Sequence, residues 1–355
     1  MKIGIPKEIK ILEGRVALIP AAAGELVRHG HEVFVETGAG DASGYDDDDY
    51  SAGGVAIVDD AAGLYGAAQM IVKVKEPLPS EYPLLRSDHL LFCYLHLAAL
   101  PELAETLCRI GLTAVAWETV EEAGKLPLLQ PMSEVAGKLA VQLASNLLYR
   151  PNQGRGLMLG GMPTTERGHV VVLGAGTVGT AATRVAAALG AEVTVFGINR
   201  DRLAAVHQLG DNVTTLPSYQ ALIDERVSTA DVVVGGVLVP GGRTPTLVSE
   251  QTVSRMRPGS VIVDVAVDQG GCIETIRPTL WDAPTYLAHE VIHFGVTNMP
   301  GAVPRTSAQA LSMAVVPYVL RLATAEGLKD PALAAGINVR EGELVHSAVR
   351  ASLTS

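Results

Sequence analysis

Three glycines in the middle of the chain have the spacing of a dinucleotide-binding loop. In VVVLGAGTVGTAATRVAAALG, Gly174, Gly176 and Gly179 fit the pattern G-x-G-x-x-G between a strand-like segment and an Ala-rich helical one. The glycines allow a tight turn, a close approach of the pyrophosphate and close helix packing. Thr177 and Val178 open the helix whose amides would face the phosphates. We predict dinucleotide binding; the alternative is a glycine-rich turn that binds nothing.

The second strand of this unit bears on which dinucleotide binds. Such strands commonly end in an acidic residue that holds a ribose 2′-hydroxyl. Here AEVTVFGINRDRL places Gly197 at that point, with Asn199, Arg200 and Arg202 close behind. Gly197 offers no side-chain acceptor, and either arginine could meet a 2′-phosphate. We therefore expect relaxed cofactor choice with NADP activity; the alternative is NAD held more weakly at the ribose.

Polar residues also interrupt apolar segments or stand at their ends. Alternation in MIVKVKEP would put Lys73 and Lys75 on one strand face. His96 ends LLFCYLH and Asp268 ends VIVDVAVD, at strand ends where open α/β sheets bind ligands. Each alone has a structural explanation, such as a satisfied core histidine, a solvated lysine or a turn-forming aspartate.

As a set, these residue types suit a small α-keto acid. Arg15, in EGRVALIP, could bind a carboxylate, and a lysine could polarise a carbonyl. A histidine could move a proton near neutral pH, and an aspartate beside a nicotinamide could activate water. Asn298, in GVTNMPGAVP, is a further candidate.

Composition narrows the class of protein. The 355 residues are 48% hydrophobic and 18% charged, with a net charge of -11, which argues against nucleic acid because phosphates need basic patches. The three cysteines are too scattered for a disulfide framework or a metal site. No signal peptide or membrane-length apolar run is evident, so we expect a cytoplasmic protein. We expect the DDDDY run to be a solvated turn, without metal.

Alternating strand-like and helix-like segments predict an α/β fold with two Rossmann-like domains on parallel sheets. Two long helices, near 134–150 and 306–326, would form the hinge around a cleft, the first with Ser133 as its N-cap. We predict a discontinuous substrate domain, residues 1–127 plus 306–355, and a dinucleotide-binding domain, residues 128–305.

Many motifs together resemble the L-alanine dehydrogenase family. They are GIPKEIKILEGRVALIP, VKVKEP, LHLA, PMSEVAGKLA, LGAGTVGT, VLVPGG, VDVAVDQGGCIE and TNMPGAVPRTS, from the N-terminus to about residue 345. The resemblance implies reversible oxidation of L-alanine to pyruvate and ammonia with NAD, two domains around a cleft, and a homohexamer. One departure is FGIN, where the family usually has an acid, as in LDIN.

The resemblance also implies roles for individual residues. Arg15 would bind the substrate carboxylate, Lys75 would polarise the carbonyl, and His96 would be the acid/base. Asp268 would activate water, and Asn298 would contact nicotinamide or substrate. Further cofactor contacts would be Ser133, Val178, Leu238 and Val267.

Several alternatives remain open. Another small amino acid, such as serine or glycine via glyoxylate, could be the substrate. The NAD-binding part of transhydrogenase shares the fold but lacks the LHLA histidine, and saccharopine dehydrogenase shares it with a different residue set. A dinucleotide-binding protein without catalysis is the remaining alternative.

Overall fold

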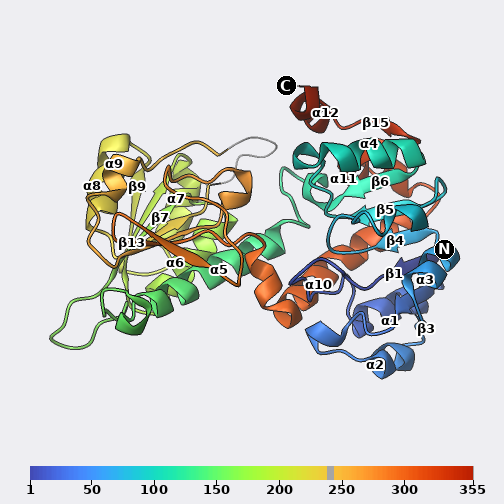
Figure 1. Ribbon diagram of the computed structural model, residues 1–355, viewed down its shortest axis with the longest axis horizontal. Coiled ribbons are helices and arrows are strands. Elements are labelled where there is room, and N and C mark those ends of the chain that lie inside the picture. Colours follow the sequence, from blue (N-terminus) through green and yellow to red (C-terminus); the bar gives the residue numbers. More distant parts are fainter. Residues whose placement is uncertain (238–243, 355) are drawn as a thin grey trace. The chain divides into compact units, whose positions relative to one another are not determined.

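A computed structural model describes residues 1–237 and 244–354, which divide into two compact units. Unit 1 comprises Met1–Met132 and Gly301–Ser355, and unit 2 comprises Ser133–Pro300. Each is an α/β unit on one mostly parallel sheet, which confirms the predicted fold class (Figure 1). Within the described residues, no helix combines the length and the apolar character that a membrane span requires.

The sheet of unit 1 reverses its strand order at β1. In spatial order its strands are β15 (Glu343–Leu344), β14 (Ile337–Arg340), β6 (Thr113–Ala116), β5 (Leu90–Cys93), β4 (Met70–Val72), β1 (Lys2–Ile5), β2 (Glu32–Glu36) and β3 (Ala56–Val58). Its helices are α1 (Pro20–Arg28), α2 (Asp47–Ala52), α3 (Ala61–Ala67), α4 (Pro101–Ile110), α10 (Pro304–Leu322), α11 (Pro331–Gly336) and α12 (Ser347–Thr354). The chain leaves β1 toward β2 and later returns to its other side as β4. In open α/β sheets, ligands bind at the strand ends beside such a reversal.

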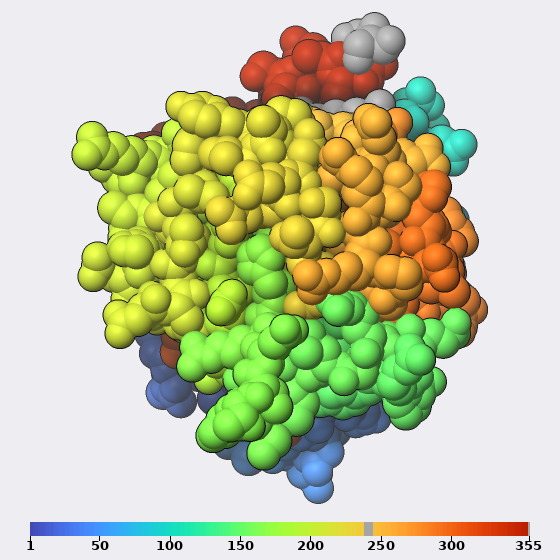
Figure 2. All heavy atoms as spheres, turned by 90° about the vertical axis from the view of Figure 1, so that its left-hand side faces the viewer, coloured from blue at the N-terminus to red at the C-terminus, as the bar shows by residue number. Residues whose placement is uncertain are grey.

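Unit 2 has the same kind of reversal at β7. Its strands run β12 (Thr285–Ala288), β13 (Val291–Phe294), β11 (Val261–Asp264), β10 (Val232–Gly235), β7 (His169–Leu173), β8 (Glu192–Gly197) and β9 (Val213–Pro217). The helices are α5 (Gln130–Leu147, in this unit from Ser133), α6 (Thr177–Ala188), α7 (Arg200–His207), α8 (Gln220–Thr229) and α9 (Glu250–Val253). Figure 2 shows a face of this unit, where much of the Gly-rich loop before β7 is exposed.

Both faces of the unit 2 sheet are buried. Val170 and Val172 belong to one apolar cluster, whereas Val171 and Leu173 on the same strand belong to another. Successive side chains of a strand point to opposite faces, so a strand covered on both sides must be apolar throughout. This explains the continuous run HVVVL.

Some local predictions are wrong. Both sheets are mixed at one side, where wholly parallel sheets were expected: β14 pairs antiparallel with both β6 and β15, and β12 pairs antiparallel with β13. Helix α5 begins at Gln130, so Ser133 lies in its first turn and is not its N-cap. The acidic run is not a solvated turn but starts α2, where Asp46 and Asp49 form a reciprocal capping box.

Lys73 is a core residue of unit 1. Strand β4 ends at Val72, so the predicted pairing of Lys73 and Lys75 on one strand face is wrong. The Lys73 side chain is 1% exposed, and its Nζ lies 3.0 Å from Glu81 Oε1 and 3.6 Å from Glu8 Oε2. Burial disfavours the ammonium, but the two carboxylates raise the pKa of Lys73 above its ordinary value.

Removal of Lys73 should destabilise the protein. Lys73→Ala leaves Glu8 and Glu81 buried without their cation, which we expect to cost about 3–5 kcal/mol in a urea titration. Lys329→Ala is the control, because that side chain is 76% exposed and should change stability by no more than about 0.5 kcal/mol. Equal stability of the two variants would contradict this account.

Candidate active site

The predicted chemical residues of unit 1 gather at its strand-order reversal. Arg15 lies on the loop after β1, Lys75 on the turn after β4, and His96 shortly after β5. The charge of Arg15 acts on Lys75, and His96 and Lys75 both approach the Glu76 carboxylate. These three residues therefore share one site, at the place where sheets of this kind bind ligands.

Arg15 is held by the neighbouring Glu13. Its guanidinium is buried; Nε donates to Glu13 Oε1 at 2.6 Å, and Nη2 donates to Oε2. Nη1 lies 3.1 Å from the sulfur of Met132. Burial disfavours the cation, but the contacts with Glu13 raise the pKa of Arg15. The paired bonds fix the guanidinium plane, which is what recognition of a planar carboxylate requires.

Lys75 is positioned through its backbone and its ammonium. Glu8 Oε1 accepts the backbone N–H groups of Val74 at 2.6 Å and Lys75 at 3.3 Å. The Lys75 Nζ lies 4.0 Å from Glu76 Oε2, and its side chain is 12% exposed. Burial lowers the pKa of Lys75, so this lysine can exchange a proton closer to neutral pH than a solvated one.

His96 has a left-handed backbone, with φ 52° and ψ 34°. Its N–H donates to Glu118 Oε1 at 2.6 Å, and Leu95 N–H contacts the same carboxylate. The ring Nδ1 lies 3.4 Å from Glu76 Oε2, and the side chain is 42% exposed. Non-glycine residues seldom adopt this conformation, so the surrounding contacts must hold it.

Three carboxylates of this site were missed by sequence reasoning: Glu13, Glu76 and Glu118. The first two stand beside a candidate cation in the sequence, in EGR and KEP. Glu118 follows β6, whose end lies beside that of β5. A search for acids next to each candidate cation would have found Glu13 and Glu76.

The glycine loop of unit 2 has the geometry that a pyrophosphate needs. Gly174 has φ 107°, and a Cβ there would lie 2.8 Å from the Gly236 carbonyl oxygen. A Cβ on Gly179 would lie 1.7 Å from Gly174 O, so the helix can pack this closely only with glycine. At Gly176 a Cβ would meet nothing within 4 Å, and no side chain caps α6 there. The residues present therefore fit a bound dinucleotide, with the first turn of α6, including Thr177 and Val178, facing it.

Gly197 ends β8 and is closely packed. A Cβ there would lie 3.0 Å from Leu203 Cδ2 and 3.1 Å from Ala175 Cβ. Asn199 caps α7, because its side chain accepts the N–H of Arg202 at 2.9 Å. Arg200 and Arg202 are both exposed on the first turn of that helix.

The remaining candidates lie on other parts of unit 2. Strand β11 ends at Asp264, so Asp268 does not end the strand as predicted; with Val267 it occupies a 3-10 turn, Val267–Gln269. Asp268 is exposed, whereas Val267 is buried. Asn298 has a left-handed φ of 57° before the turn Met299–Ala302. Leu238 lies outside the described residues.

Comparison with known proteins gives consistent matches along the chain. The family described as alanine dehydrogenase/PNT, N-terminal domain, matches residues 4–136, and the corresponding C-terminal domain matches residues 140–347. The chain is 48% identical to the alanine dehydrogenase of Bacillus subtilis, over 99% of this chain and 95% of that protein. It is 45% identical to the alanine dehydrogenase of Mycobacterium tuberculosis, over 99% and 97%.

Solved structures agree with the sequence matches. An L-alanine dehydrogenase superposes with a TM-score of 0.96 at 51% identity, covering 100% of this chain and 99% of that one. A transhydrogenase from Sinorhizobium meliloti gives 0.87 at 26% identity, over 97% and 100%. Matches over both domains, at this identity and coverage, show that the chain belongs to the alanine dehydrogenase family.

Proposed function

We propose that the protein oxidatively deaminates L-alanine to pyruvate and ammonia, reversibly, with a nicotinamide cofactor. The observation that carries this proposal is the cluster of Arg15, Lys75 and His96 at the strand-order reversal of unit 1. Unit 1 would serve as the substrate domain, and unit 2, with its glycine loop, as the dinucleotide domain.

The substrate is held by the two cations of unit 1. Arg15, whose orientation is fixed by its hydrogen bonds to Glu13, binds the carboxylate of alanine or pyruvate. Lys75 donates to the oxygen that is a carbonyl in pyruvate and is added from water during deamination. A nicotinamide held by the glycine loop would supply a hydride acceptor. Once the alanine ammonium has lost a proton to solvent, loss of the Cα hydride with its two electrons would leave a substrate iminium.

Proton transfers complete the reaction. Water adds through its oxygen to the iminium carbon and gives one proton to His96, or to Asp268, which the family resemblance implies as the alternative acceptor. His96 then protonates the amine as the C–N bond breaks, which releases ammonia. The hydroxyl group loses its proton to solvent as it becomes the carbonyl that Lys75 stabilises. A histidine suits both transfers because its proton affinity is balanced near neutral pH.

Loss of either group should stop turnover without loss of dinucleotide binding. We expect Lys75→Ala and His96→Ala to lower kcat by about 10²–10⁴-fold, the usual worth of positioned acid–base groups. NADH binding, measured by fluorescence titration, should stay near the parent value because the glycine loop lies in unit 2. Near-parental kcat in either variant would refute the assigned role.

The choice of dinucleotide is a separate part of the proposal. We infer that the enzyme uses NADP as well as NAD, because Gly197 provides no carboxylate to bind a 2′-hydroxyl or to repel a 2′-phosphate. The exposed Arg200 and Arg202, on the first turn of α7, can supply the positive charge. A parent enzyme that prefers NAD by about a thousandfold in kcat/KM would contradict this inference.

Gly197→Asp should move the preference toward NAD, by about tenfold or more in the ratio of kcat/KM values, since charge-assisted bonds contribute about 1.5–3 kcal/mol. The new Cβ requires Leu203 and Ala175 to shift by a few tenths of an ångström. Gly197→Ala is therefore the matched control, because it adds the same Cβ without the carboxylate. An unchanged ratio, or an equal change in both variants, would show that the carboxylate does not set the preference.

Substrate range and assembly complete the proposal. We expect alanine and pyruvate to be preferred over serine, glycine and glyoxylate, and a homo-oligomer, a hexamer by family membership. A panel of amino and keto acids with both cofactors tests the first expectation, and light scattering on the eluted protein tests the second.

A further inference from the structure

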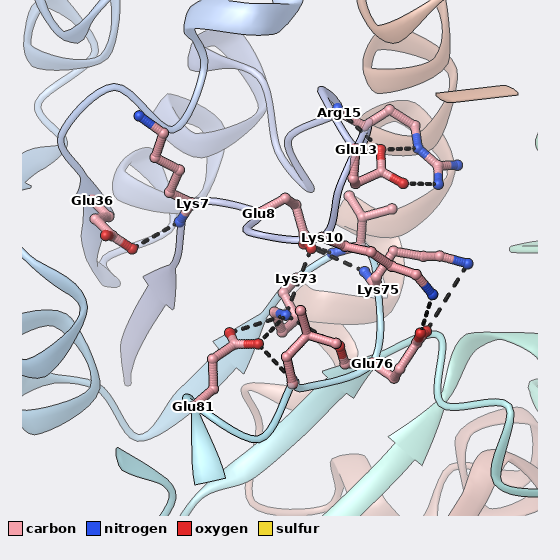
Figure 3. Close-up of polar contacts among 12 residues, drawn as sticks. Lys7, Glu8, Lys10, Glu13, Arg15, Glu36, Lys73, Lys75, Glu76 and Glu81 are labelled. Carbon is pink, nitrogen blue, oxygen red and sulfur yellow. Dashed lines mark hydrogen bonds and ion pairs between the residues drawn. The ribbon is translucent and has the colours of Figure 1, made fainter. Parts of the chain in front are cut away.

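Glu76 is the point at which the cations of unit 1 converge. Its carboxylate is buried, with 6% of the side chain exposed. Oε1 accepts a hydrogen bond from the Lys10 ammonium, and Oε2 faces the Lys75 ammonium at 4.0 Å and the His96 Nδ1 at 3.4 Å. Figure 3 shows this carboxylate facing Lys10 and Lys75. One anion therefore lies beside two groups that the proposed function assigns to chemistry.

The charge state of Glu76 is set by these neighbours. Burial opposes its ionisation, but the contacts with His96, Lys75 and Lys10 outweigh burial and hold the pKa of Glu76 well below its ordinary value. Glu76 is thus a permanent anion. Its Oε2 makes no hydrogen bond with the described residues, so it acts on Lys75 and His96 through charge at short range.

We propose that Glu76 is a positioning residue that joins Lys75 and His96 into one ionic cluster. With Glu76 on the Nδ1 side, the His96 Nε2 is the nitrogen turned to the substrate. The same carboxylate keeps the buried Lys75 in its ammonium form. This inference rests on the proposed function and adds a residue to it.

Other charged groups also act on Lys75, and one of them, Lys10, provides the control variant. The charged groups that act on it are Glu76, Lys10, Arg15 and Glu13. Lys10 is the outermost partner of Glu76, with 39% of its side chain exposed, and it has no assigned chemistry. Lys10→Gln therefore removes a partner of Glu76 while the Glu76 anion stays.

Reduction of pyruvate in the presence of ammonia, followed against pH, tests the proposal. Burial already lowers the pKa of Lys75, and Glu76 is the largest influence that raises it. In Glu76→Gln, we expect the alkaline limb of the rate profile to move to lower pH by about one unit, as loss of a nearby opposite charge does. We expect kcat to fall by about 10–10²-fold while KM for pyruvate stays within about threefold, because Arg15 still binds the carboxylate.

Two further variants separate positioning from simple loss of structure. Glu76→Asp keeps the charge, so its alkaline limb should lie closer to the parent's than that of Glu76→Gln. Lys10→Gln should leave kcat near the parental value and should move the alkaline limb, if at all, to higher pH, because the charge of Lys10 lowers the pKa of Lys75. The proposal is overturned if Glu76→Gln keeps the parental alkaline limb and kcat, or if Glu76→Asp moves the limb to lower pH as far as Glu76→Gln does. It is also overturned if Lys10→Gln moves the limb to lower pH and lowers kcat as Glu76→Gln does.

Failure of this inference can be distinguished from failure of the proposed function. Turnover of alanine by the unaltered enzyme tests that function directly, whereas the Glu76 variants are compared only with the parent. Unaltered NADH binding by each variant shows that unit 2 has folded.

Discussion

Charge held away from water is the constraint on which unit 1 depends. An ammonium or guanidinium can be buried only beside an anion, because desolvation otherwise outweighs its attractions. The loops after β1 and β4 meet this requirement with acidic partners for each cation: Glu13 for Arg15, Glu8 and Glu81 for Lys73, and Glu76 for Lys75. The partners fix where each cation lies, so the shape of the site follows from electrostatic pairing.

Unit 2 meets a different requirement by different means. A phosphate binds to backbone N–H groups at a helix N-terminus, and a side chain beside those groups would keep the phosphate at a distance. Glycine therefore occupies the positions where the backbone is most crowded. The closest case is Gly179, where a Cβ would lie 1.7 Å from Gly174 O. In the proposed function, charged side chains of unit 1 bind the small acid, and the bare backbone of the unit 2 glycine loop suits the dinucleotide.

The sequence predicted the fold class and the glycine loop because both are written in short, continuous patterns. Val170 to Leu173 are apolar without interruption, and the glycine spacing is local. The sequence misplaced Lys73 and Asp268 relative to the strand ends, because strands β4 and β11 end earlier than their apolar runs suggest. Where a strand stops depends on pairing with its neighbours, which is a property of the sheet rather than of the segment. The pairing of Glu8 with Lys73 could not be predicted either, because it joins residues that are far apart in the chain and meet only in the folded unit.

Gly197, which stands where the family usually has an acid, is also constrained by the packing around it. The missing carboxylate is evident from the residues alone, but the structure shows that Leu203 and Ala175 now crowd the place where its Cβ would stand. Leu203 lies on α7, the helix that also carries Arg200 and Arg202. A side chain at 197 therefore requires the Leu203 side chain on this helix to shift by a few tenths of an ångström. The effect of an acid introduced at 197 on the proposed cofactor choice should therefore depend on that packing as well as on charge.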